Sequence, residues 1–308
     1  MRDHQFVRKI SRAVIPAAGL GTRMLPATKV VPKEMLAVSG KPLIQYAVEE
    51  AAASGIETII LVIGRRKRLL RKYFEPDPAL ERFLESRGHL AEASMIRQLP
   101  ELARLRFVEQ QKPLGIADAI RCARGLVGND PFVVLLPDVI IRAAEPAAQQ
   151  LIRAYSRQPG SIIAIREVEL ADIPRHGIVR AAGLADNGNP RLLRIASLVE
   201  KPPVEDAPSR FGVFGRYLLE PTIFEAINQT RPGVRGEIEL TDALNLLCGD
   251  RAVSGCCFEG THYDAGDPLG LLKASVEIAM EDSHLQPLLR SYFRQLQSGE
   301  KRTAEKTI

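Results

Sequence analysis

The chain of 308 residues contains no tryptophan, and only 5% of its residues are aromatic. Surfaces that bind single-stranded nucleic acid stack bases on aromatic side chains, so this composition argues against such a surface. No apolar run approaches the ~20 residues that a membrane-spanning helix needs. Residues 1–12 are basic, and no apolar stretch long enough for a signal peptide follows them. We therefore expect a cytoplasmic protein that has neither nucleic acid nor a membrane as its partner.

Cysteine is also scarce. The four cysteines are Cys122, Cys248, Cys256 and Cys257. They show no C-x-x-C spacing, and two of them are adjacent in an apolar, strand-like run. This usage favours reduced, buried thiols over disulfides or a zinc site.

The most informative stretch is residues 13–36, AVIPAAGLGTRMLPATKVVPKEML. A short apolar strand over 13–16 leads into the glycine-rich turn 19–23, and Lys33 follows in a proline-punctuated loop. Glycine lets the backbone approach a ligand closely, and successive loop N–H groups form an anion-binding concavity. Together with the net charge of +5, this pattern predicts a phosphate-binding loop.

Two better-known phosphate loops do not fit. A Walker loop needs a lysine directly after its last glycine, and none follows Gly21. A dinucleotide fingerprint needs a third glycine where Met24 stands, and an acidic residue near the end of the next strand. That strand, 58–63, instead ends in the basic run 65–72, which we interpret as a solvated helix face. The pattern therefore favours neither a P-loop NTPase nor a nicotinamide enzyme.

Strand and helix patterns alternate along the first half of the chain. The expected strands are 13–16, 58–63, 105–108 and 132–136, and the expected helices are 43–52, 78–98 and 115–124. Such alternation predicts a doubly wound, mainly parallel α/β sheet, in which ligands bind at the carboxyl ends of strands. The loop 19–23, Gln110 and Asp138 all follow strands, so we expect them to meet in one crevice.

The second half is more mixed. Its expected strands are 162–168, 192–200, 212–219 and 256–258, its expected helices are 220–228 and 240–247, and 183–190 is expected to be a turn. A helical tail is expected from about 269, becoming polar and frayed from about 298. Without an internal repeat or a low-complexity linker, the pattern favours one compact unit.

Two aspartates stand at informative places. Asp138 follows a buried apolar strand, and Asp264 lies in a polar turn far along the chain. Each alone fits an ordinary role, Asp138 as a helix N-cap and Asp264 as a turn residue. Two carboxylates are also enough for Mg²⁺, which keeps waters and takes its other ligands from substrate phosphates.

From about residue 12 to about 280 the chain resembles the sugar-1-phosphate nucleotidyltransferases. The family's blocks follow in order as KPLIQYAVEEA, CARGLVGNDPF, LLPDV, HGIV, VEKP, GRYLL, GEIELTDAL and YDAGDPLG. KPLIQYAVEE and GEIELTDA resemble the bacterial uridylyl branch in particular. The resemblance implies a three-layer α/β/α, Rossmann-like nucleotidyltransferase fold with a mixed, mainly parallel central sheet. It implies one domain over 1–308, with a nucleotide-binding part (11–160), a sugar-phosphate-binding part (161–280) and a helical tail (281–308).

The resemblance also implies a reaction. The uridylyl group of UTP passes to α-D-glucose 1-phosphate, giving UDP-glucose and pyrophosphate. The attack is in line, assisted by Mg²⁺ and without a covalent enzyme intermediate. Relatives form homodimers or homotetramers, so a homo-oligomer is expected. Apolar residues recur at helical spacing over 285–296 and suit either such an interface or packing on the chain's own core.

Site roles follow from the resemblance position by position. The implied catalytic residues are Arg23, Lys33, Asp138 and Lys201. The implied nucleotide-binding residues are Ala18, Gly19, Gly21, Thr22, Glu34, Gln110 and Gly115. The implied sugar-phosphate-binding residues are Gly177, Glu200, Lys201 and Val213. Asp138 and Asp264 are the implied ligands of Mg²⁺.

Three positions depart from the family pattern. Asp118 replaces a usual histidine, His176 stands where tyrosine is frequent, and Ala265 replaces cysteine. Asp118 places a negative charge near the nucleotide and so leaves the nucleotide preference open. Two alternatives remain: a member of the family that uses dTTP, ATP, GTP or another sugar phosphate, and a catalytically silent paralogue that regulates an active enzyme. We interpret His176 and His262 as hydrogen-bonded loop histidines.

Overall fold

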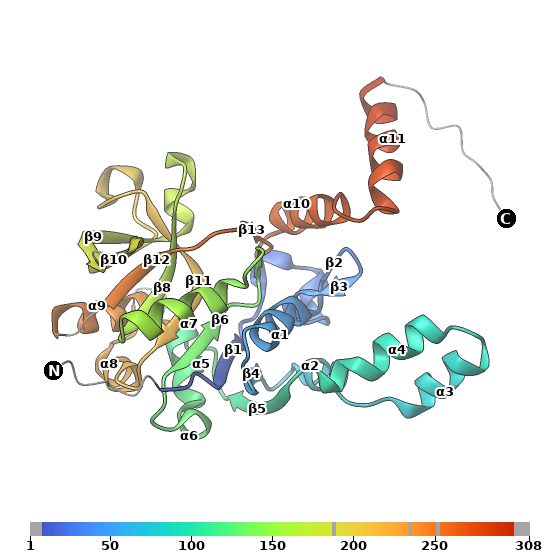
Figure 1. Cartoon of the computed structure of the whole chain (residues 1–308), viewed down its shortest axis with the longest axis horizontal. Coiled ribbons are helices and arrows are strands. Elements are labelled where there is room, and N and C mark those ends of the chain that lie inside the picture. The colour runs from blue at the N-terminus through green and yellow to red at the C-terminus, as the bar shows by residue number, and fades with distance from the viewer. Residues whose placement is uncertain (1–7, 187–188, 234–235, 251–252, 299–308) are drawn as a thin grey trace.

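The structure is a computed structural model that describes residues 8–186, 189–233, 236–250 and 253–298. Its centre is a nine-stranded sheet in the order β5-β4-β1-β6-β11-β8-β12-β10-β9 (Figure 1). The strands are β1 (Arg12–Ala17), β4 (Thr58–Gly64), β5 (Arg104–Gln110), β6 (Phe132–Leu135), β8 (Ser161–Glu167), β9 (Gly177–Asp186), β10 (Asn189–Glu200), β11 (Phe211–Leu219) and β12 (Val253–Cys257).

The sheet is mixed but mainly parallel, as expected. β5, β4, β1 and β6 form a parallel block, and β8 and β12 are also parallel to each other. Only β11 and β10 run against the other strands of this sheet. Two small antiparallel sheets flank it: β2 (Ala37–Val38) with β3 (Lys41–Pro42), and β7 (Val139–Arg142) with β13 (Thr261–Asp264).

Helices cover both faces of the sheet. They are α1 (Leu43–Ala53), α2 (Arg68–Tyr73), α3 (Pro78–Ser86), α4 (Leu90–Gln98), α5 (Ile116–Cys122), α6 (Arg124–Val127), α7 (Ala147–Arg157), α8 (Ile223–Gln229), α9 (Leu240–Asp250), α10 (Pro268–Ala279) and α11 (Leu285–Ser298). α1, α2 and α7 share one core cluster, and α5, α6, α8 and α9 share the other. Among the described residues, none of these helices is long and apolar enough to cross a membrane.

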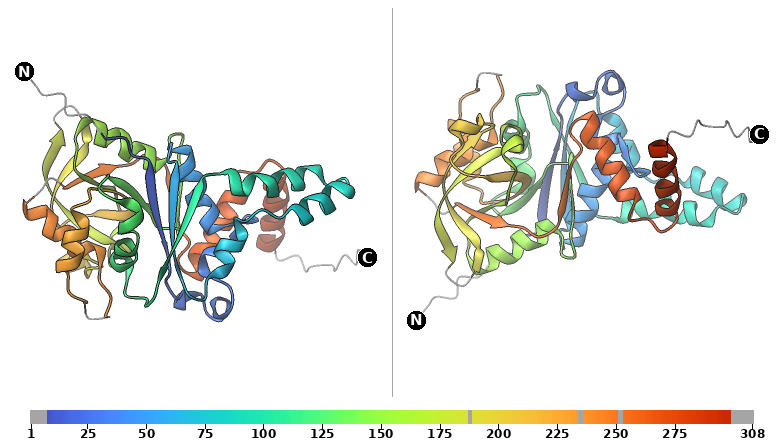
Figure 2. Two further views of the ribbon diagram at one scale, coloured as in Figure 1. Left: turned by 90° about the horizontal axis from the view of Figure 1, so that it is seen from below. Right: turned by 90° about the horizontal axis from the view of Figure 1, so that it is seen from above.

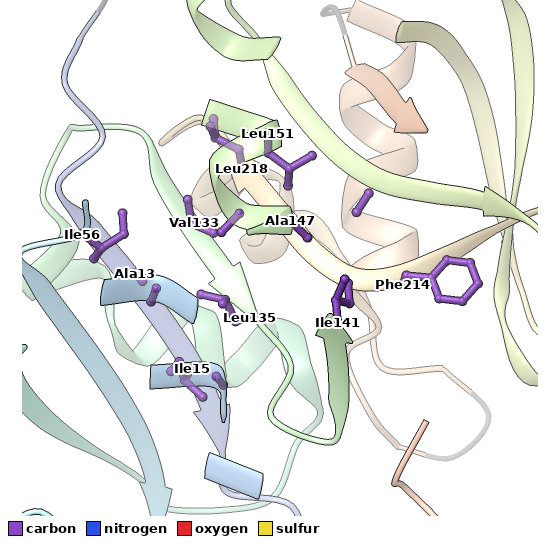
Figure 3. Close-up of a cluster of buried hydrophobic side chains, with 14 of the residues drawn as sticks. Ala13, Ile15, Ile56, Val133, Leu135, Ile141, Ala147, Leu151, Phe214 and Leu218 are labelled. Carbon is purple, nitrogen blue, oxygen red and sulfur yellow. The ribbon is translucent and has the colours of Figure 1, made fainter. Parts of the chain in front are cut away.

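The apolar sequence of β1 explains the layering. Side chains alternate across a strand, so Ala13 and Ile15 enter the α1/α7 core while Val14 enters the opposite one. Figure 3 shows residues of the first cluster, among them Ala13 and Ile15 of β1, Val133 and Leu135 of β6, and Ala147 and Leu151 of α7. A central strand that is buried on both faces confirms the predicted α/β/α architecture.

Two of the predicted secondary-structure ranges were wrong. The helix expected over 78–98 is a hairpin of α3 and α4, because Gly88 adopts a left-handed φ of +79°. The turn expected over 183–190 is mostly strand. β9 continues to Asp186 and β10 begins at Asn189, with irregular pairing that tolerates glycine and proline. Residues 187–188 lie outside the described part, as does the tail beyond 298.

The α3–α4 hairpin and α11 project from the end of the molecule opposite β9 and β10 (Figures 1 and 2). None of the residues of α3 or α11 is buried. Both elements therefore lie outside the core that positions the site.

One buried ion pair joins the two halves of the chain. Arg216 of β11 is 0% exposed, and its guanidinium holds both carboxylate oxygens of Glu50 of α1, with Nη2 at 2.7 Å from Oε2. The same guanidinium donates to the carbonyl oxygens of Leu136 at 3.0 Å and Val139 at 2.8 Å. These carbonyls flank Asp138, so Arg216 fixes the loop that carries it.

We expect Arg216→Met to lower the free energy of unfolding by about 3–5 kcal/mol, because Glu50 would keep a buried charge with no cation. Urea denaturation measures this loss. Arg142→Met is the matched control, because the Arg142–Glu281 pair is about half exposed and is expected to contribute less than about 1 kcal/mol. Equal losses in the two variants would contradict this role for Arg216.

Candidate active site

The glycine loop folds back on the segment that carries Lys33. Gly21 has a φ of +67° and begins the short 3₁₀ helix Thr22–Met24. The Thr28 hydroxyl donates to the carbonyl oxygen of Gly21 at 2.8 Å. A Cβ at position 21 would lie 3.1 Å from Lys33 Cβ. Both the backbone conformation and the close approach therefore require glycine here.

Two adjoining cavities contain all of the predicted site residues. The glycine-loop cavity, of about 350 Å³, is lined by Ala18, Gly19, Gly21, Thr22, Arg23, Lys33, Glu34, Gln110, Gly115 and Asp138, among others. The Glu200 cavity, of about 190 Å³, is lined by Arg23, Asp138, Gly177, Glu200, Lys201, Val213 and Asp264, among others. Arg23 and Asp138 line both cavities, so the two meet at these side chains. The glycine-loop cavity lies where β1, β5 and β6 end, as a doubly wound sheet predicts.

Lys33 and Asp138 form an ion pair at the junction. Lys33 Nζ lies 2.8 Å from Asp138 Oδ2, and both side chains are mostly buried. Burial opposes charge on both groups, but the attraction outweighs it. The pKa of Lys33 is raised by Asp138 and Glu34 in spite of burial, and the pKa of Asp138 is lowered by Lys33 in spite of burial. Both groups therefore stay charged at neutral pH.

Gly266 faces three charged atoms at once. A Cβ at this position would lie 2.9 Å from Asp264 Oδ1, 3.0 Å from Arg23 Nη2 and 3.2 Å from Asp138 Oδ2. The two carboxylates thus converge on one point that the missing side chain leaves open. Arg175 Nη2 lies 3.1 Å from the other Asp264 oxygen. Sequence analysis expected Asp264 in a turn, whereas it is the last residue of β13.

Glu34 forms a buried ion pair with one residue of the basic run 65–72. It is 2% exposed, and Lys67 Nζ donates to its two oxygens at 2.8 and 2.6 Å. Burial lowers the pKa of Lys67, and Glu34 opposes that shift. Lys67 therefore does not belong to the solvated face expected for 65–72. It fixes the carboxylate of Glu34, which lines the same cavity as the glycine loop.

The Glu200 cavity has its own charged pair. Lys201 Nζ lies 2.9 Å from Glu200 Oε1, and the Thr241 hydroxyl donates to Glu200 Oε2 at 2.6 Å. A Cβ at Gly177 would lie 3.2 Å from Glu200 Oε2 and 3.8 Å from Val213 Cγ2. Lys201 adopts a left-handed φ of +45°. These contacts bring the four predicted sugar-side residues together around the Glu200 carboxylate.

Two histidines line this cavity beside Phe214. His176 Nδ1 lies 3.4 Å from the carbonyl oxygen of Val213. His262 packs edge-on against the Phe214 ring, with the ring centres 4.3 Å apart. Burial, aided by Arg166 and His176, lowers the pKa of His262 to about 4. His262 belongs to strand β13, so the interpretation as a loop histidine was wrong for it.

Thr241 and Arg175 were not among the residues predicted for the site. Thr241 lies within the matched block GEIELTDAL, and Arg175 immediately precedes the block HGIV. The two blocks could have drawn attention to these positions. Only the folded chain shows that their side chains contact the carboxylates of Glu200 and Asp264.

Asp118 does not present an uncompensated charge to the cavity. It is 4% exposed, and its Oδ2 accepts from Gln110 Nε2 at 2.7 Å. Its Oδ1 accepts from Arg121 Nη2. The Arg121 guanidinium balances the carboxylate, which removes the repulsion expected between Asp118 and a nucleotide.

Comparisons with known proteins show the family to which the chain belongs. Residues 12–281 match the nucleotidyl transferase family. The chain is 40% identical over 96% of its length, and 99% of the relative, to the UTP–glucose-1-phosphate uridylyltransferase of Bacillus subtilis (strain 168). A UDP-glucose pyrophosphorylase complexed with UDP-glucose superposes with a TM-score of 0.80 at 38% identity, covering 89% of this chain and 100% of that one. A UTP-bound UGPase from Acinetobacter baumannii gives a TM-score of 0.85 at 36% identity, covering 94% and 100%. The chain belongs to the nucleotidyl transferase family.

Proposed function

We propose that the chain transfers the uridylyl group of UTP to α-D-glucose 1-phosphate, giving UDP-glucose and pyrophosphate. The observation that carries this proposal is the pair of cavities that meet at Arg23 and Asp138. One cavity has the glycine loop suited to a triphosphate, and the other has the Glu200–Lys201 pair suited to a sugar phosphate. Similarity to the uridylyltransferases over nearly the whole chain supports the same assignment.

The nucleotide is assigned to the glycine-loop cavity. Backbone groups of Ala18 and Gly19 would contact it, while Gly21 and Thr22 shape the loop. Gln110 and Gly115 would read the uracil edge. Glu34 would help to bind the nucleotide, and its buried pair with Lys67 holds its carboxylate in place.

The chief obstacle to the reaction is charge. At 4 Å, two like unit charges repel by ~1 kcal/mol in water but by ~4 kcal/mol at an effective dielectric constant near 20. A sugar phosphate that approaches a triphosphate meets several such repulsions. Arg23 and Lys33 would counter the charge of the triphosphate and the departing pyrophosphate, and Lys201 that of the sugar phosphate. Catalysis of this kind rests on positioning and counter-charge.

Enzymes of this family generally use a divalent metal. We assign Mg²⁺ to the carboxylates of Asp138 and Asp264, each of which places an oxygen within 3.2 Å of the position that a Gly266 Cβ would occupy, because two carboxylate oxygens suit a hard cation that takes further oxygens from water and phosphate. Among the described residues, no group of three or more metal-binding side chains offers a self-sufficient site. When bound, Mg²⁺ supplies positive charge to the phosphate oxygens during transfer.

The transfer needs no enzyme nucleophile. A phosphate oxygen of the sugar phosphate attacks the α-phosphorus in line, that bond forms, and the bond to the pyrophosphate oxygen breaks. Glu200 would accept hydrogen bonds from sugar hydroxyls, held in place by Thr241. Gly177 and Val213 would complete the wall against which the sugar lies.

A homodimer or homotetramer is proposed through α11. Its residues Leu285, Leu288, Tyr292 and Leu296 are all exposed, and none of its residues is buried against the described part of the chain. This placement favours an interface over packing on the chain's own core.

We predict pyrophosphate release from UTP and glucose 1-phosphate with Mg²⁺, well above release with dTTP, ATP or GTP, and none with EDTA. Asp138→Asn is expected to lower kcat by about 10²-fold or more, because Mg²⁺ would lose one of its two carboxylate ligands and the reacting phosphate would lose the charge stabilisation that the metal supplies. A coupled pyrophosphate assay on the purified protein measures both effects.

Asp130→Asn is the matched control, since Asp130 pairs with Arg12 outside both cavities. A preference for another nucleotide would move the chain elsewhere in its family. Nucleotide binding without any release would instead support the silent paralogue.

Thr241→Val should raise KM for glucose 1-phosphate about three- to tenfold, because Glu200 loses one hydrogen bond that orients it. KM for UTP should stay unchanged. Thr230→Val serves as the control, because its hydroxyl bonds only within its own helical segment. An equal rise in both KM values, or no rise for glucose 1-phosphate, would contradict a role for Thr241 in orienting Glu200 toward the sugar.

A further inference from the structure

Gln110 is the last residue of β5 and lines the glycine-loop cavity. Its amide nitrogen Nε2 donates to Asp118 Oδ2 at 2.7 Å and to the carbonyl oxygen of Gly115 at 3.2 Å. An amide nitrogen carries two hydrogens, so these two acceptors use both of them. The amide oxygen Oε1 is therefore the polar atom that remains for a ligand.

Asp118 decides the orientation of this amide. A carboxylate and a carbonyl can only accept hydrogen bonds, so a flipped Gln110 would set Oε1 against two acceptor oxygens. None of the described residues donates to Oε1, and no fully buried side-chain oxygen or nitrogen among them lacks a partner. Oε1 is therefore not fully buried, and Gln110 lines the glycine-loop cavity.

Arg121 compensates the charge of the buried Asp118 carboxylate. The Asp118 side chain is 6% exposed, and a carboxylate so buried needs a compensating cation. Arg121 Nη2 donates to Oδ1, the oxygen that Gln110 does not use. Each Asp118 oxygen thus has its own donor, and the carboxylate cannot turn away from Gln110 without losing one.

We propose that Asp118 is a positioning residue that fixes Gln110 with its amide oxygen toward the base, so that the site selects a pyrimidine that carries a hydrogen on N3. This inference rests on the proposed uridylyl transfer and names the origin of its base selectivity. Uracil carries a hydrogen on N3, whereas N3 of cytosine is an acceptor. The histidine usual in relatives can donate as well as accept, so it does not impose one amide orientation by itself.

The wild-type protein gives the first test. Isothermal titration calorimetry would compare UTP, CTP and N3-methyl-UTP, which lacks the N3 hydrogen. We expect UTP to bind at least about tenfold more tightly than either, the effect of one buried hydrogen bond. Binding of N3-methyl-UTP as tight as that of UTP would overturn the inference alone. A failure to bind UTP at all would overturn the proposed function as well.

Variants test Asp118 itself. In Asp118→Asn the new amide offers both a donor and an acceptor, so a flipped Gln110 is opposed only by the longer contact to the Gly115 carbonyl oxygen at 3.2 Å. The UTP-to-CTP affinity ratio should then fall about tenfold, while kcat with saturating UTP changes by less than about twofold. Asp118→Glu keeps an acceptor-only group and should restore most of the ratio.

Asp130→Asn is the control for removing one charge that pairs with an arginine, and it should leave the ratio unchanged. If Asp118→Asn only loosened the local packing, UTP and CTP would weaken together. An unchanged ratio in that variant would overturn the role of Asp118.

Discussion

The buried bridge between Arg216 and Glu50 is the constraint on which the site depends. Glu50 belongs to α1 and Arg216 to β11, and the two residues are 166 positions apart in sequence. The guanidinium also holds the backbone on both sides of Asp138, and Glu50 accepts from the N–H of Ala148 at the start of α7 at 3.1 Å. A short loop between two strands would otherwise be free to shift. Here it has a fixed place relative to both halves of the chain, so Asp138 can serve both cavities.

Within the site, three lysines each have a carboxylate partner. Lys33 pairs with Asp138, Lys67 with Glu34, and Lys201 with Glu200. Partly buried cations without partners would repel one another and be costly to keep charged. Pairing keeps the positive charge in position before any anion arrives. The phosphates of the substrates can then take over cations that are already oriented, which is the preorganisation that catalysis by counter-charge requires.

The sequence was sufficient for the architecture, and the residues that it predicted for the site line two adjoining cavities. Strand-to-helix alternation and the glycine loop indicated where a parallel sheet would place a ligand, and Gln110 and Asp138 do lie there. The hairpin at Gly88 was missed because a single left-handed residue breaks an otherwise continuous helical pattern. Thr241 and Lys67 were missed because their importance lies in contacts with Glu200 and Glu34, and periodicity carries no information about such partners.

Asp118 also shows that the effect of a residue depends on contacts that the sequence does not reveal. From the sequence alone, we expected Asp118 to place a negative charge near the nucleotide. In the fold it is a buried acceptor balanced by Arg121 and bonded to Gln110. The sign of a side chain's effect therefore depends on neighbours that only the tertiary structure supplies.

The measurement that tests the central claim most directly is the stereochemical course at the α-phosphorus. One diastereomer of UTP with sulfur on the α-phosphorus would be incubated with glucose 1-phosphate, and ³¹P NMR would assign the configuration of the product. A single in-line attack, made where the two cavities meet at Asp138, predicts UDP-glucose with inverted configuration. Retention would require a covalent enzyme intermediate and would contradict the account.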